Sequence, residues 1–353
     1  MQEKLQKLFM GFYKKVKRFL ISRHVRSIAK NDLKQKNILT KQEKKKAEEF
    51  YKPYRKIDPV FHAFYKEKTG EFNVKNLPID CYINDVDEYF NDRSASHVLD
   101  NKCLYSRLFP GISVIEVIAS RMNGFWYDGN MQMITKSEWI DLISKEEAVF
   151  VKAATDSCGG KGVKFIEKSK IGELDKFLEK QPGDLVVQRP FVQHHSFAQL
   201  NSYSVNTLRI LSLLTDTGVT FYSAIVRMGV GNTKVDNASQ GGIFCGLEED
   251  GTLKDTAYRL SGERFKTHPD NGMTFDGYKI VGLDKAKELI KKAHPMIPYF
   301  RMISWDIVID ENGEAHMLEA NFAKGSVNFH QLSNGPLFGE DTETILREVF
   351  VKK

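Results

Sequence analysis

Residues 304–321 read SWDIVIDENGEAHMLEAN, where two acids and an amide interrupt a pattern typical of a buried hairpin. Asn312-Gly313 separates two runs of alternating apolar residues. This dipeptide is the strongest short-range signal for a hairpin with a two-residue loop, because both loop residues need positive φ. Counting back from that loop puts Asp306 directly opposite Glu319. The sequence therefore predicts two carboxylates facing each other on neighbouring strands.

The acids of this hairpin predict a metal site. Side chains alternate along a strand, so Asn321 is expected on the same face as Glu319. Like charges directly opposite each other are unfavourable unless something neutralises them. Two carboxylates and an amide oxygen suit Mg²⁺ or Mn²⁺, usually shared with substrate phosphates. We expect metal ligands at Asp306, Glu319 and Asn321, and we expect the metal-free protein to tolerate loss of either carboxylate. A hairpin with a polar outer face is the alternative interpretation.

The composition is that of an ordinary soluble enzyme. The chain has 353 residues, of which 41% are hydrophobic and 28% charged, enough for two or three subdomains. Its four cysteines form no CxxC pair, which argues against a disulfide scaffold or a zinc site and for a reducing compartment. No apolar run of about 18 residues and no signal-peptide core is present, so we expect a cytoplasmic location.

The positive charge is concentrated near the N-terminus. Residues 1–56 hold 18 Lys and Arg against 5 Asp and Glu, a balance of +13, and helical periodicity runs to about residue 51. Apolar residues recur at helical spacing among these lysines, at Leu5, Leu8, Phe9, Phe12, Val16, Phe19 and Leu20. Such a helix suits peripheral contact of residues 1–30 with an anionic membrane. The alternative is an ordinary helix that packs its apolar stripe on the body. No nucleic-acid-binding module accompanies the basic run, so we expect no nucleic-acid partner.

A second stretch, VKAATDSCGGKGV, points to phosphate chemistry. Lys152 ends an apolar strand, and a glycine-rich turn carrying Lys161 follows. Adjacent glycines let backbone N–H groups approach phosphate oxygens, and lysine adds a point charge. The spacing matches neither a Walker motif nor a dinucleotide fingerprint. Arg209 and Arg227 interrupt apolar strands further along, and a desolvated arginine needs an anion, either a substrate group or a structural carboxylate.

Together these stretches resemble the ATP-grasp superfamily. The segments RMGVGNTKVDNASQGGIFCGLEEDG, THPDNGMTFDGY and SWDIVIDENGEAHMLEANFAKG are most similar to the sugar-transfer-associated ATP-grasp proteins, over roughly residues 95–340. The resemblance implies an α+β fold with two α+β subdomains gripping ATP, preceded here by a basic helical extension. The implied division is a basic amphipathic region 1–56, a mixed helical region 57–110, a subdomain with the glycine-rich loop 111–190 and a C-terminal subdomain with the metal site 191–353.

The resemblance also implies roles for individual residues. VVQRPFV matches the hinge strand that meets adenine, and the usual acidic residue of that hinge is missing, so Gln188, His195 or Gln199 is expected to serve the ribose. The implied ATP-binding residues are Lys102, Lys152, Ser157, Gly159, Gly160, Lys161, Gly162, Gln188, Arg189, Val192 and Asn237. The implied substrate-facing cations are Arg209, Arg227 and Lys324, and the implied metal ligands are Asp306, Glu319 and Asn321.

The function that follows from the resemblance is an ATP-dependent carboxylate–amine (or thiol) ligase that uses Mg²⁺ or Mn²⁺ and an acyl-phosphate intermediate. Its substrate is expected to be a sugar acid or an amino acid linked to cell-surface polysaccharide assembly. One alternative is a kinase on the same scaffold, which phosphorylates a sugar or polyol hydroxyl. The other is a non-catalytic ATP-binding scaffold of the polysaccharide machinery.

Overall fold

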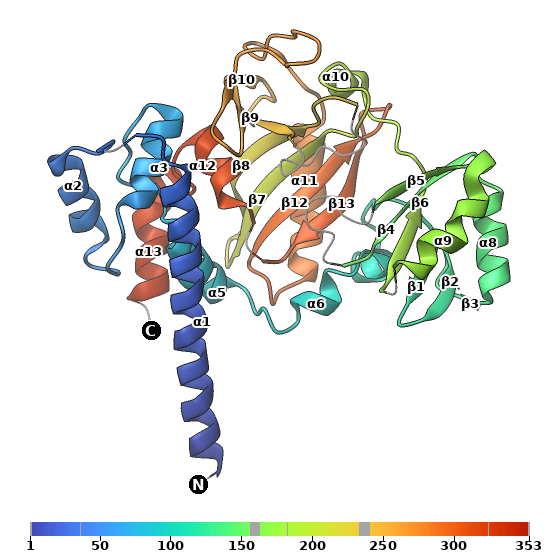
Figure 1. Ribbon diagram of the computed structural model, residues 1–353, viewed down its shortest axis with the longest axis horizontal. Coiled ribbons are helices and arrows are strands. Elements are labelled where there is room, and N and C mark those ends of the chain that lie inside the picture. The colour runs from blue at the N-terminus through green and yellow to red at the C-terminus, as the bar shows by residue number, and fades with distance from the viewer. Residues whose placement is uncertain are drawn as a thin grey trace.

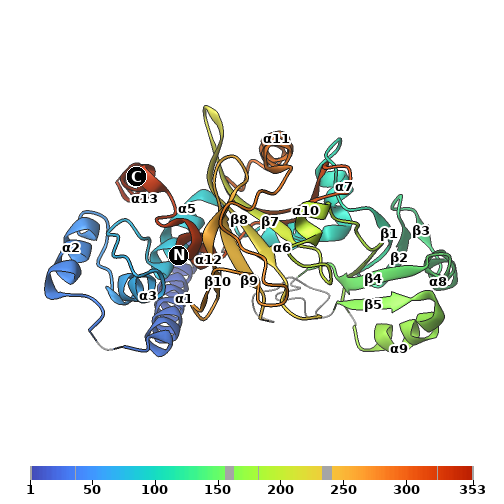
Figure 2. The same cartoon turned by 90° about the horizontal axis from the view of Figure 1, so that it is seen from above.

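The computed structural model describes residues 2–35, 37–155, 163–181, 183–232, 241–323 and 325–351. Two antiparallel sheets and a group of N-terminal helices lie side by side, with the larger sheet in the middle (Figure 1, Figure 2). Helices and antiparallel strands occur in both halves of the molecule, which confirms the α+β class.

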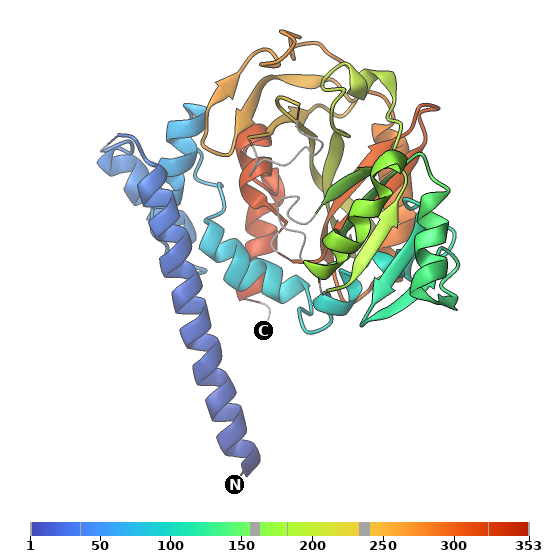
Figure 3. The ribbon, with the colours of Figure 1, turned by 45° about the vertical axis from the view of Figure 1, so that its right-hand side comes forward.

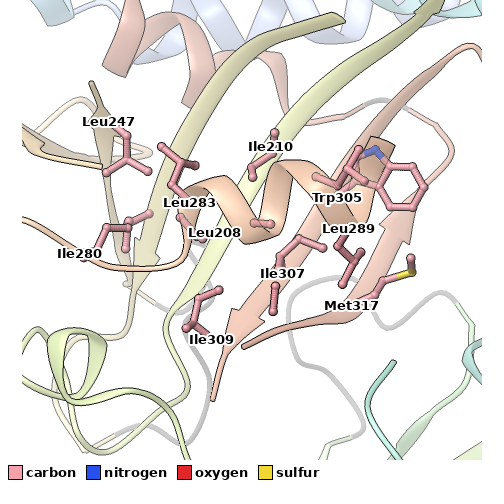
Figure 4. Packing of buried hydrophobic residues seen from close by; sticks show 14 of the residues in the cluster. Leu208, Ile210, Leu247, Ile280, Leu283, Leu289, Trp305, Ile307, Ile309 and Met317 are labelled. Atoms are coloured by element: carbon pink, nitrogen blue, oxygen red, sulfur yellow. The ribbon is translucent and has the colours of Figure 1, made fainter. Parts of the chain in front are cut away.

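The larger sheet has seven strands in the order β11-β10-β9-β8-β7-β12-β13. These strands are β7 (Thr207–Thr215), β8 (Gly218–Met228), β9 (Ile243–Leu247), β10 (Leu253–Arg259), β11 (Arg264–Phe265), β12 (Met302–Ile309) and β13 (Ala315–Asn321). Helix α11 (Leu283–Ala293) covers one face of this sheet (Figure 4). Its Leu283 and Leu289 pack in one core with side chains that alternate along β7 and β12, namely Leu208, Ile210, Ile307 and Ile309. Arg209 lies between Leu208 and Ile210, and Asp306 lies between the core residues Trp305 and Ile307, so both point to the opposite face.

The smaller sheet has six strands in the order β3-β2-β1-β6-β4-β5. These are β1 (Val117–Met122), β2 (Phe125–Asp128), β3 (Met133–Ile134), β4 (Ala148–Ala153), β5 (Lys164–Glu167) and β6 (Leu185–Gln188). Helices α8 (Lys136–Ser144) and α9 (Leu174–Glu179) pack on one face, where Val149 and Val151 of β4 join Trp139 and Leu178 in a core. Alternation along β4 then turns Phe150 and Lys152 to the other face, which lies towards the larger sheet (Figure 2).

The N-terminal helices form a third layer. They are α1 (Gln2–Asp32), α2 (Lys41–Tyr51), α3 (Val60–Thr69), α4 (Ile79–Cys81) and α5 (Asp87–Phe90), the last two joined by a π-helical turn at Tyr82–Val86. The helical stretch expected up to residue 51 is two helices, because Thr40 starts α2 with a capping box to Glu43. Their shared core includes Leu211 and Leu213 of the larger sheet, so this layer covers part of the face opposite α11. None of the described helices combines the length and apolarity needed to cross a bilayer.

Shorter elements complete the described chain. They are α6 (Ser96–Leu99), α7 (Tyr105–Leu108), α10 (His195–Ala198), α12 (Val327–Asn334) and α13 (Thr342–Phe350), and the 3₁₀ turns Lys102–Leu104, Lys168–Glu173, His294–Met296 and Gly339–Asp341. The turn at Lys102–Leu104 contacts β1 and β6 of the smaller sheet, and the backbone N–H of Lys102 donates to the carbonyl of Ala154 (3.1 Å). Lys102 is thereby fixed beside the end of β4, close to Lys152.

Candidate active site

The predicted pairing of Asp306 with Glu319 is confirmed, but the reason given for it was wrong. The loop has three residues rather than two, since Asp310 pairs with Glu314 (N–H to carbonyl, 2.9 Å) and Gly313 takes φ 79°. A three-residue loop would by itself shift the strand pairing by one residue, so that Asp306 would face Leu318. A β-bulge in β13 shifts it back, because Ile307 pairs with Met317 while Asp306 pairs with Glu319.

The bulge also decides which face Glu319 occupies. Met317 belongs to the core under α11, and in a regular strand Glu319 would point there too. Leu318 is the extra residue, so Ala320 returns to that core and Glu319 turns to the face of Asp306. Bulges commonly re-aim side chains next to active sites. One inserted residue thus brings both carboxylates to the same side of the sheet.

Asp306 is neutralised by arginines, which the sequence reasoning treated separately. Its side chain is 2% exposed; Arg209 donates to both carboxylate oxygens (2.7 and 2.6 Å), and Arg227 donates to one of them (3.0 Å). The three residues sit on adjacent strands β7, β8 and β12. Burial alone would raise the pKa of Asp306, but the two guanidinium groups outweigh it and hold the pKa below its ordinary value.

Glu319 is balanced by lysines. The Lys102 ammonium donates to its carboxylate at 2.6 Å, and the Glu319 side chain stays 30% exposed. Lys152 lies in the same electrostatic neighbourhood: burial and the nearby charge of Lys102 lower its pKa to about 8, while Glu319 acts in the opposite direction. Four cations therefore surround two carboxylates. The expectation that loss of either carboxylate relieves repulsion is corrected, because each carboxylate already has cationic partners.

An apolar cleft of about 130 Å³ opens beside this charged cluster, between the two sheets. Phe150, Lys152 and Gln188 line it from the smaller sheet, and Val308 and Leu318 line it from the larger one; Ile115, Val163, Arg189, Phe191 and Val205 complete the lining. A larger cavity of about 590 Å³ adjoins it and shares Ile115, Gln188, Arg189 and Leu318. Small-molecule sites are typically apolar with a few placed polar groups, and this cleft has that character.

The structure brings some of the predicted hinge residues to the cleft and leaves others outside. Gln188 is 5% exposed and lines it. Arg189 also lines it, although its guanidinium is bound by Glu146 (2.7 Å) and Glu116. Val192 is 62% exposed and does not line the cleft; its neighbour Phe191 does. A backbone role for Val192 stays a prediction.

The other two ribose candidates lie outside the cleft lining. His195 is exposed in α10, and Gln199 accepts a hydrogen bond from the Tyr278 hydroxyl (2.9 Å). The remaining predicted residues, namely Ser157, Gly159, Gly160, Lys161, Gly162, Asn237 and Lys324, lie outside the described residues. Of the three ribose candidates, the cleft geometry is compatible with Gln188.

Sequence reasoning missed the apolar walls of the cleft. Phe150 precedes Lys152 by two positions and Val308 follows Asp306 by two, so strand alternation puts each on the same face as its charged neighbour. That signal was available in the sequence. Leu318 could not be found in this way, because alternation from Glu319 would put Leu318 on the opposite face, and only the bulge lets these two neighbours share one face.

The donor atoms near the carboxylates fit a hard divalent cation completed by phosphate oxygens. Asn321 uses its amide N–H on the carbonyl of Ser304 (3.0 Å), which leaves its oxygen as a donor atom. Glu319 is 30% exposed and is the carboxylate more open to a cation, whereas Asp306 is 2% exposed and already binds two guanidinium groups and Asn321. No cluster of three or more His, Cys, Asp or Glu side chains suited to a metal occurs in the described part of the chain. Mg²⁺ needs no such cluster, since it is usually held by one or two carboxylates together with substrate phosphates and waters.

The structure has two antiparallel α+β units with charged residues at the end of an apolar cleft between them, the arrangement expected of an ATP-grasp protein. The chain belongs to the sugar-transfer-associated ATP-grasp family, whose model matches residues 84–345. No curated protein matches the chain.

The chain is also similar to solved structures. The D-alanine–D-alanine ligase from Coxiella burnetii is 11% identical, with a TM-score of 0.42 over 73% of this chain and 60% of that one. D-cycloserine synthetase DcsG is 12% identical, with a TM-score of 0.42 over 70% of each chain. D-alanyl-alanine synthetase A from Vibrio cholerae is 13% identical, with a TM-score of 0.40 over 74% of this chain and 66% of that one. The chain thus spans 60% of the length of the first of these proteins.

Proposed function

We propose that this protein is an ATP-dependent ligase that joins a carboxylate to an amine or thiol through an acyl phosphate. The observation that carries the proposal is the charge balance at the end of the apolar cleft. Lys102, Lys152, Arg209 and Arg227 supply four positive charges against the two of Asp306 and Glu319. A site with surplus positive charge beside an apolar slot suits a base attached to a polyphosphate.

In this proposal the cleft holds the nucleotide. Adenine lies between the apolar side chains of Phe150, Val308 and Leu318, with Gln188 at the end of β6 near the ribose. Lys152 reaches from the same lining towards the phosphates, and Lys102 stands next to it. Ser157, Gly159, Gly160, Lys161, Gly162 and Asn237, which lie outside the described residues, are assigned to the nucleotide by the resemblance alone.

The chemistry proceeds in two displacements. A substrate carboxylate oxygen attacks the γ-phosphorus, the bond to the β,γ-bridging oxygen breaks, and ADP leaves. The amine nitrogen then attacks the acyl carbon, the bond to the phosphate oxygen breaks, and inorganic phosphate leaves with loss of one proton from nitrogen. Arg209, Arg227 and Lys324 hold the anionic groups in place, so catalysis is mainly positioning and charge neutralisation. Asp306, Glu319 and Asn321 would hold Mg²⁺ or Mn²⁺, which would supply charge stabilisation to the transferring phosphoryl group.

The substrates in this proposal are a sugar acid or amino acid and an amine linked to cell-surface polysaccharide assembly, in line with the family to which the chain belongs. We place the reaction in the cytoplasm, at its membrane face, where lipid-linked glycans are assembled. The family alone supports the polysaccharide link.

The test is a screen of acids and amines in pairs with ATP, with phosphate release as the readout and mass spectrometry of the products. A ligase gives ADP, inorganic phosphate and an amide, and needs both partners. An ATP-dependent phosphoester without free phosphate would instead assign a kinase acting on a hydroxyl. Nucleotide binding without turnover on any pair would assign a non-catalytic scaffold.

The matched control for this screen is Glu319→Gln, which keeps the size of the side chain and removes its charge. We expect it to abolish metal-dependent turnover and to lower nucleotide-free stability only modestly, because glutamine keeps an oxygen that can accept from Lys102. Lys136→Gln, which removes an exposed ammonium that pairs with the exposed Asp175 (2.7 Å), controls for altered charge.

A further inference from the structure

Helix α1 presents a continuous apolar stripe to solvent. Phe9, Phe12 and Phe19 are 68, 66 and 65% exposed. At 3.6 residues per turn these three lie within a sector of roughly 80°. The whole stripe consists of Phe9, Phe12, Tyr13, Val16, Phe19 and Leu20, all exposed. Single exposed apolar residues are normal on a protein surface, but six on one helix face mark an interaction site.

Contacts between the opposite face of α1 and the rest of the protein keep this stripe facing solvent. The opposite face of α1 carries the residues that contact the body: Arg18 pairs with Asp85 and Glu88, and Arg26 pairs with Asp80 (2.6 Å). Ser22 accepts a hydrogen bond from Asn84 (3.0 Å), and Ala29 is 2% exposed. Rotating the stripe inward would break all of these contacts. The interpretation in which the stripe packs on the body is therefore wrong, and Figure 3 shows the N-terminal half of α1 projecting away from the other elements.

The charge of α1 indicates which kind of partner binds the stripe. The helix holds nine Lys and Arg against two Asp and Glu, a balance of +7. Lys15 and Lys17 are exposed on either side of the stripe. A second copy would bring two +7 helices together, so a self-associating coiled coil along this stripe is disfavoured by charge repulsion. Phenylalanines on one face with lysines at its margins are instead typical of helices that lie in an anionic lipid interface.

We propose that α1 docks this protein on an anionic bilayer, with the Phe9–Leu20 stripe in the interfacial layer and the helix axis parallel to the surface. The lysines meet lipid phosphates while the aromatic side chains enter the headgroup region. The contacts of Arg18, Arg26 and Ala29 connect the membrane-bound helix to the rest of the protein. The docking uses no residue of the ATP site, so it stands or falls apart from the proposed ligase activity.

The experiment is cosedimentation of the full-length protein with vesicles of pure phosphatidylcholine or of phosphatidylcholine with phosphatidylglycerol. We expect binding to the anionic vesicles, weakening as salt rises, because exposed charges are screened beyond about 8 Å at physiological salt. The double variant Phe12→Ser/Phe19→Ser should bind at least about tenfold more weakly. Its melting temperature should not change, because both side chains are exposed.

The matched control replaces two exposed aromatic residues elsewhere, Phe125→Ser/Tyr299→Ser, which are 54 and 67% exposed. It should bind vesicles like the natural protein. Equal binding by the stripe variant would overturn the proposal, because charge alone would then account for the attraction. Sedimentation velocity supplies the other decisive outcome: a dimer that the stripe variant loses, without vesicle binding, would assign the stripe to a second copy and overturn the lipid partner.

Discussion

At the scale of single residues, Lys152 shows how its surroundings tune a side chain for phosphate. Burial and the neighbouring Lys102 lower its pKa to about 8, and the Glu319 carboxylate limits the shift. The ammonium is therefore mostly charged near neutral pH but loses its proton a little above it. A phosphate beside Lys152 favours the charged form, so nucleotide binding and protonation are linked.

This linkage predicts a pH-dependent affinity. ADP affinity should fall as pH rises from about 7.5 to about 9.5, because free Lys152 loses its charge in that window. Calorimetry on the natural protein and on Lys152→Arg checks this. Arginine stays charged throughout the range, so its affinity should be flat with pH. A decline of the same slope in Lys152→Arg would mean that another group titrates.

The same lysine should distinguish nucleotides by their phosphates. Lys152→Ala should weaken ATP binding by about ten- to a hundredfold and AMP binding far less, since AMP lacks the β- and γ-groups. Lys164→Ala is the control: it removes an ammonium of β5 that pairs with the half-exposed Glu173 (2.7 Å) and lies over the Phe177 ring. An equal loss for both nucleotides would make Lys152 a structural residue.

Asp306 leads to a stability prediction. Asp306→Ala takes from Arg209 and Arg227, each 7% exposed, the carboxylate that they share. Breaking a buried pair by removing one partner costs about 3–5 kcal/mol. The variant should therefore melt well below the natural protein, whereas Glu319→Gln should lose less, because Glu319 is 30% exposed and glutamine keeps an acceptor for Lys102. Because the folded pKa of Asp306 is lowered, its stabilisation is present above the unfolded pKa and is lost as pH falls through the folded one. Thermal unfolding of both variants, with and without MgADP, is the measurement.

At the scale of elements, the β12–β13 hairpin shows what a sequence pattern can and cannot predict. Alternation and the Asn312-Gly313 signal correctly predicted a hairpin that pairs Asp306 with Glu319. The three-residue loop and the bulge at Leu318 were both missed, and their one-residue shifts cancel. A bulge depends on which residues the α11 core accepts, here Met317 and Ala320, and that is a property of the packed sheet rather than of the strand.

The bulge residue itself can be tested. Leu318 lines the apolar cleft, so Leu318→Ala should weaken ATP and AMP by the same factor, about three- to tenfold. This is the opposite pattern to Lys152→Ala, because an apolar wall contacts the base and not the phosphates. Met317→Leu, on the α11 side of the same strand, is the control. A loss confined to ATP would place Leu318 near the phosphates instead.

At the scale of the whole molecule, the sequence predicted the two-unit ATP-grasp class through its resemblance, which the family match confirms. It did not reveal that Arg209, Arg227 and Asp306 form one buried cluster, because that requires the strand order β8-β7-β12. It also left the direction of the α1 stripe open. Helical spacing predicts a stripe but not which side of the helix packs on the body. Here Asp80, Asp85 and Glu88 form ion pairs with arginines on the basic side, so that side packs on the body.

That arrangement predicts that the two halves of α1 contribute unequally to stability. Deleting residues 1–13 should leave the melting temperature within about 1–2 °C, because Phe9, Phe12 and Tyr13 are exposed and the retained Arg18 and Arg26 hold the helix to the body. Ala29→Asp should lower it by several degrees, since it buries a carboxylate at a site only 2% exposed. Calorimetric unfolding in vesicle-free buffer compares both with the full-length chain. If the truncation melts as low as Ala29→Asp, the outer half of α1 packs against the body in solution and its stripe is covered there.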